Sequence, residues 1–170
     1  MDNIEQRLRQ RIRLLTWIFI LGLVFSGATA IPLEPELNWL ANFMGDGTPA
    51  HQTNGFAAWI FRVRDAVHDT NARYPFLAYG TDWLAFGHFV IAIAFVGALR
   101  DPVRNIWLFK FGMIACAMIV PYAFIFGAVR GIPIGWRLID CSFGVFGIVP
   151  VWLCRRWASE LSGGQGLCRR

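Results

Sequence analysis

His88 and Asp140 are the residues whose type and position most strongly suggest chemistry in this sequence. Each lies inside a long apolar stretch, about eight or nine residues from the same end of that stretch if both stretches cross a membrane as helices. Ionisable side chains at such depth are costly, so they usually face a protein interior and mark a functional site. Imidazole and carboxylate groups exchange protons and also bind metals, so the pair indicates a site without naming a reaction.

Further polar residues fall near the same level. Counting along the helix that runs the opposite way places Tyr122 at about the depth of His88 and Asp140. Arg137 precedes Asp140 by three residues, a spacing that lets the two pair on one helix face, and Asp82 lies nearer the outside. The sequence therefore predicts a polar pocket open to the outside, built from His88, Asp140, Arg137, Asp82 and Tyr122.

The function expected of this pocket is binding of a small ligand or ion, coupled to protons in transport or serving as a sensor. Asp140 is the expected proton-exchanging or cation-facing carboxylate, and Arg137 is expected to tune its pKa. His88 is the expected second titrating group or ligand.

Three alternatives stay open at this level. The first is a membrane oxidoreductase carrying haem or a transition metal with His88 as a ligand; it is less favoured because His88 is the only histidine within an apolar stretch. The second is a subunit of a larger membrane complex. The third is purely structural: an Arg137–Asp140 ion pair and a hydrogen-bonded His88 would fix helix register and bind nothing.

The elements that position these residues are four apolar segments. The chain has 170 residues, of which 56% are hydrophobic and 16% charged, below the charge content of ordinary soluble domains. Each segment is near the roughly 17–25 residues that cross a bilayer as a helix. The predicted fold is all-α, with four transmembrane helices in an antiparallel bundle that forms a single domain over 1–158, followed by a flexible tail at 159–170. The predicted spans cover 14–31, 79–99, 106–129 and 132–154.

The connection over 32–78 is too long for a plain turn. From Phe56 to Val67, apolar residues recur at helical spacing, with charged residues on the other faces. This pattern predicts an amphipathic helix in the outer segment, lying on the membrane surface or covering the mouth of the bundle as a lid.

The net charge of +5 is distributed unevenly. Basic residues cluster before the first segment, between the second and third, and after the fourth, which places both termini in the cytoplasm of a bacterial-type plasma membrane. The partners expected are the lipid bilayer and a small molecule or ion, with no nucleic acid. Gly22, Ser26 and Ala30 form a small-residue ladder that serves packing within the bundle or self-association into a homo-oligomer.

Several function classes find no support in the sequence. The fingerprints of serine hydrolases, zinc peptidases, phosphate-binding loops and dinucleotide-binding folds do not occur in a usable context. A thiol-exchanging membrane enzyme would need cysteines on the outer side, and none of the four cysteines is predicted there.

Overall fold

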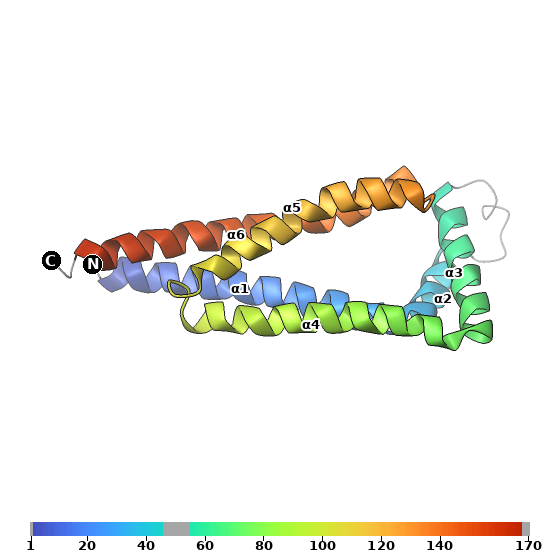
Figure 1. The fold of residues 1–170 in the computed structure, drawn as a ribbon, viewed down its shortest axis with the longest axis horizontal. Helices are drawn as coiled ribbons and strands as arrows, with labels where there is room; N and C mark the ends of the chain where they lie inside the picture. Colours follow the sequence, from blue (N-terminus) through green and yellow to red (C-terminus); the bar gives the residue numbers. More distant parts are fainter. Residues whose placement is uncertain (1, 46–54, 168–170) are drawn as a thin grey trace. The chain divides into compact units, whose positions relative to one another are not determined.

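The computed structural model describes residues 2–45 and 55–167, and over these residues it is helical without any strand (Figure 1). The elements follow one another in the order α1 (Asp2–Ala30), α2 (Leu33–Phe43), α3 (Gly55–Arg73), the short 3-10 helix η2 (Pro75–Ala78), α4 (Tyr79–Arg100), α5 (Ile106–Val129) and α6 (Ile134–Leu167).

Four helical stretches are long and apolar enough to cross a membrane: Asn3–Ala30, Pro75–Arg100, Ile106–Val129 and Ile134–Gly163. Many large apolar side chains on them are exposed, including Phe25, Ile93 and Phe146. Such surfaces are stable against lipid and unfavourable against water. The prediction of an all-helical fold with four candidate membrane spans is thus confirmed, whereas the antiparallel bundle remains a prediction.

The helices extend further than the apolar segments. α1 begins at Asp2, so the basic N-terminal segment is continuous with the first span. α6 continues to Leu167 and therefore runs through most of the segment for which the sequence predicts a flexible tail. Hydropathy locates the hydrocarbon-compatible part of a helix, whereas the helix itself continues beyond it. In α1 the continuation consists largely of charged residues that are good helix formers, whereas the end of α6 also includes Gly163, Gly164 and Gly166, which are poor helix formers.

The chain divides into two compact units. The first comprises Met1–Leu23 and Val90–Arg170, and the second comprises Val24–Phe89. The division falls within α1 and α4, and the single four-span domain expected from the sequence stays a prediction.

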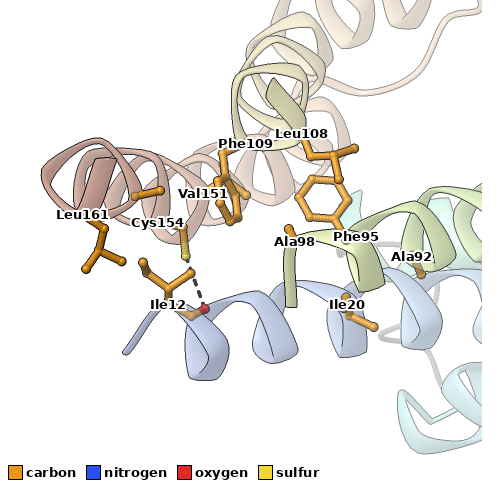
Figure 2. Packing of buried hydrophobic residues seen from close by; sticks show 11 residues of the cluster. Ile12, Ile20, Ala92, Phe95, Ala98, Leu108, Phe109, Val151, Cys154 and Leu161 are labelled. Atoms are coloured by element: carbon orange, nitrogen blue, oxygen red, sulfur yellow. Dashed lines mark hydrogen bonds between the residues drawn. The ribbon is translucent and has the colours of Figure 1, made fainter. Parts of the chain in front are cut away.

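The core of the first unit joins segments that are far apart in the sequence (Figure 2). Phe95 and Phe109 are fully buried, with ring centroids 6.3 Å apart. On α6, the Cys154 thiol donates to the carbonyl of Ile12 on α1 at 3.6 Å. Thr16, the only buried polar residue among those described, donates to the same carbonyl at 2.7 Å. The polar groups of this core are thus satisfied inside it.

Two glycines bring α6 against α5. A Cβ added at Gly144 would lie 2.5 Å from the carbonyl oxygen of Cys116, and one at Gly147 would lie 2.9 Å from the Cys116 sulfur. Only glycine leaves room for this approach of the two backbones. The turn between the helices contains Gly131 at φ 68°, a conformation that side chains other than glycine's rarely adopt.

The second unit contains α2, α3 and the adjoining parts of α1 and α4. Ala41 of α2 packs against Ala57 and Phe61 of α3. At Gly27 on α1, an added Cβ would lie 3.0 Å from the Ala85 carbonyl oxygen of α4. Gly22, the first residue of the small-residue ladder, has no neighbour within 4 Å of such a Cβ, so the close approach on α1 is made by Gly27. Whether the ladder serves packing or self-association stays a prediction. α3 is helical as its spacing predicts; its place on the membrane surface stays a prediction.

Candidate functional site

A groove of about 690 Å³ lies along α5 and the start of α6, within the first unit. Its polar wall is formed by Tyr122, Arg130 and Asp140, and its apolar wall includes Met118, Ile119 and Phe126. The sequence places these polar groups together because Tyr122 and Asp140 lie at similar distances from the short turn that joins the two helices.

Asp140 is half-buried and makes no hydrogen bond or ion pair within the described chain. Three carboxylates elsewhere in the described chain are paired: Glu5 with Arg9, Glu34 with His68 and Glu160 with Arg156. A partly buried carboxylate in an apolar span is costly when it is ionised and unpaired. Asp140 is therefore the groove residue with the greatest capacity to gain from a cation or a proton.

The side chain of Arg137 contacts the turn between α5 and α6 rather than Asp140. Its Nε–H donates to the carbonyl of Ile132 at 2.7 Å. Its methylene groups lie over Gly127 of α5, where an added Cβ would be 2.8 Å from Arg137 Cδ. The side chain fastens the turn between α5 and α6 and forms no ion pair with Asp140 in the described structure, so the expected pairing is replaced by a backbone contact.

His88 belongs to the second unit. Its Nδ1 is 2.8 Å from the carbonyl oxygen of Leu84, and because a carbonyl only accepts, Nδ1 carries the proton. The neutral ring then has its lone pair on Nε2, the nitrogen free to accept a hydrogen bond or bind a metal. Within the described residues, no group of three His, Cys, Asp or Glu side chains is placed to hold a metal ion. The metal role of His88 remains a prediction.

Asp82 also belongs to the second unit and lies at the first turn of α4. It lines a pocket of about 270 Å³ together with Tyr79, Trp83 and Phe86. Of the five residues predicted to share one pocket, the structure brings Tyr122 and Asp140 together on the groove and places Arg137 at its turn. Asp82 and His88 have their own local surroundings, and the five-residue pocket stays a prediction.

A polar contact between α2 and α3 has no counterpart in the sequence analysis. Glu34 Oε1 lies 2.7 Å from His68 Nδ1, and Glu34 Oε2 accepts from Asn71 Nδ2 at 2.7 Å. The hydrogen bonds from Asn71 and His68 lower the pKa of Glu34, and the same carboxylate raises the pKa of His68. The helical spacing of His68 and Asn71, three residues apart, is a local signal for this cluster, but their partner Glu34 lies 34 residues from His68 and 37 from Asn71.

Comparison with known proteins adds no identity to these observations. No protein-family model, curated protein or solved structure matches the chain.

Proposed function

We propose that the groove between α5 and α6 binds a hydrophobic organic cation within the membrane, and that Asp140 exchanges its proton for that cation. The observation that carries the proposal is the half-buried carboxylate of Asp140, without a partner in the described chain, on a groove whose other wall is apolar. The setting is a four-span antiparallel bundle in a bacterial-type inner membrane, with both termini in the cytoplasm.

The chemistry follows from the low polarity of the groove. A charge pair is stronger there than in water, whereas a lone carboxylate is penalised and takes up a proton. Binding of a cation to the carboxylate form therefore releases the proton held by the empty groove. Such competition links cation binding to proton movement, which is what a proton-coupled carrier or sensor requires.

The other residues that line the groove indicate the size and polarity of the ligand. Met118, Ile119 and Phe126 offer apolar area to the body of the molecule, while Tyr122 supplies a hydroxyl. Arg130, which is exposed at the turn, adds a positive charge to the groove, and its repulsion grows with the charge of the ligand, so a singly charged cation is favoured over a multiply charged one. A monovalent cation with a bulky apolar body fits this wall better than a small hydrated metal ion, which would lose its water in exchange for a single carboxylate.

Equilibrium dialysis of tetraphenylphosphonium against the protein in a maltoside detergent tests the proposal. We expect saturable binding accompanied by proton release in weakly buffered solution. Because the carboxylate supplies the charge, Asp140→Asn is expected to weaken binding at least about tenfold and abolish proton release.

The matched control is Asp69→Asn, which removes an exposed carboxylate on α3 and is expected to leave both readouts unchanged. Unsaturable uptake, or equal affinity in wild type and Asp140→Asn, would contradict the proposal.

A further inference from the structure

The first two turns of α4 carry an aromatic and acidic face that the groove on α5 and α6 does not include. Tyr79, Asp82, Trp83 and Phe86 follow one another at offsets of three, four and seven residues, which place them on one side of the helix. They line one pocket of about 270 Å³, entirely within the second unit. Sequence spacing and geometry therefore agree on a single local site.

The three rings stand edge to face along this side. The centroids of Tyr79 and Trp83 are 5.8 Å apart, those of Trp83 and Phe86 are 5.4 Å apart, and both pairs have interplanar angles of 86°. More than half of each side chain is exposed. Neighbouring rings at right angles to one another can form adjacent walls of an aromatic cage, whose faces meet around a rounded cation.

Asp82 supplies a carboxyl group to the same pocket. It is exposed and has no hydrogen-bond or ion-pair partner in the part of the chain described. An acidic residue in a first turn also stabilises its own helix, and aromatic residues at the end of a span also anchor it in the headgroup region. Neither role requires three rings and a carboxylate to line a common pocket.

We propose that Tyr79, Asp82, Trp83 and Phe86 bind an alkylammonium group. Ring faces attract a cation that sheds water easily, and the carboxylate adds a charge that the rings lack. The group comes either from the headgroup of a zwitterionic lipid or from a free quaternary ammonium compound. This site uses none of the residues of the groove on α5 and α6, so the two proposals stand or fall separately.

The test is a titration with tetramethylammonium chloride of protein carrying ¹⁵N-tryptophan in maltoside detergent. The indole N–H resonance of Trp83 is identified by its absence in Trp83→Phe. We expect a saturable shift of this resonance that sodium chloride at equal ionic strength does not produce. Asp82→Asn is expected to weaken the apparent affinity about fivefold, because one charge-assisted contact is lost.

Two matched variants serve as controls. Asp69→Asn removes an exposed carboxylate elsewhere, and Trp39→Leu removes an exposed ring that stacks on Phe43 of α2. Both are expected to keep the wild-type affinity, with helix content monitored by circular dichroism. A Trp83 shift that does not saturate, or an affinity that Asp82→Asn leaves unchanged while the helix content is retained, overturns the proposal.

Bilayer discs identify the source of the cation. If the natural occupant is a lipid headgroup, tetramethylammonium binds more weakly in phosphatidylcholine discs than in discs of digalactosyldiacylglycerol, which is also uncharged overall but has no ammonium group, because choline groups already compete for the site. If it is a free compound, the affinities in the two discs agree. Both results require the Asp82-dependent site and so support the proposal.

Discussion

Arg137 serves packing although it lies three residues from Asp140. Its Nε–H satisfies the carbonyl of Ile132, and its methylene groups cover Gly127, so a charged side chain replaces the apolar contact that glycine cannot make. Asp140 lines the groove and forms no ion pair with Arg137 in the described structure. At the scale of single residues, Arg137 thus closes a turn, whereas Asp140 lines the groove without a partner in the described chain, and this difference is the basis of the proposed cation site.

The Glu34–His68 contact gives a pH dependence to the packing of α2 on α3. The raised pKa of His68 means that its contribution is complete below its ordinary value of 6.5 and is lost as the pH rises through the folded value. The lowered pKa of Glu34 means that its contribution is complete above its ordinary value of 4.5 and is lost as the pH falls through the folded value. The contact is strongest between these limits.

We therefore expect Glu34→Gln to lower the pKa of His68 towards 6.5, because the neutral amide no longer favours the imidazolium form. NMR titration of the His68 ring measures this change. Glu36→Gln is the matched control, since Glu36 is a neighbouring exposed carboxylate without a contact to His68 in the described structure. Equal His68 titration in wild type and Glu34→Gln would contradict the assignment.

At the scale of elements, the spans could be predicted from the sequence and their exact partners could not. Hydropathy places α5 at Ile106–Val129, the same limits as the predicted third span, because burial in lipid depends on each segment's own composition. Local spacing likewise identified α3. The contact between Gly27 and Ala85 depends on the rotation of α1 about its own axis, which decides whether Gly22 or Gly27 faces α4. The periodicity of a single sequence does not determine this rotation.

The contacts of the candidate site residues could likewise be predicted only in part. Depth counting along two helices joined by a short turn grouped Tyr122 with Asp140, because the count begins at a shared point. Met118 also lines the groove, one helical turn before Tyr122, although its apolar side chain gave the depth count no signal. The bond of Arg137 to the turn was missed, because nothing in the spacing favours a backbone acceptor over a carboxylate one turn away.

The crossing of α5 and α6 depends on Gly144. We expect Gly144→Ala to lower the stability by about 1–3 kcal/mol, because the new methyl group would meet the Cys116 carbonyl and force the helices apart. Gly135→Ala on the same helix meets nothing within 4 Å and is expected to be neutral or to gain up to about 1 kcal/mol from helix propensity. Thermal unfolding in detergent compares the two, and equal melting temperatures would show that the crossing has room for a side chain.

At the scale of the whole molecule, the distribution of basic residues predicts which segments face the cytoplasm. We expect a membrane-impermeant maleimide to label Thr70→Cys in intact cells, and Ser159→Cys only after permeabilisation. The background carries Cys168→Ser, and the other three cysteines are buried. Labelling of both sites from the same side would contradict an arrangement of four spans with cytoplasmic termini.

The contact of Cys154 with Ile12 joins residues 142 positions apart, so it has a bearing on biosynthesis. Because α1 is synthesised long before α6, it first exists without its final neighbour. The Thr16 hydroxyl is satisfied even before α6 is present, because it donates to the carbonyl of Ile12 in its own helix. Cys154 then arrives at an acceptor that is already engaged, and a weak thiol donor completes the site at little desolvation cost. Helix α1 thus satisfies the hydroxyl of Thr16 within itself before α6 packs against it.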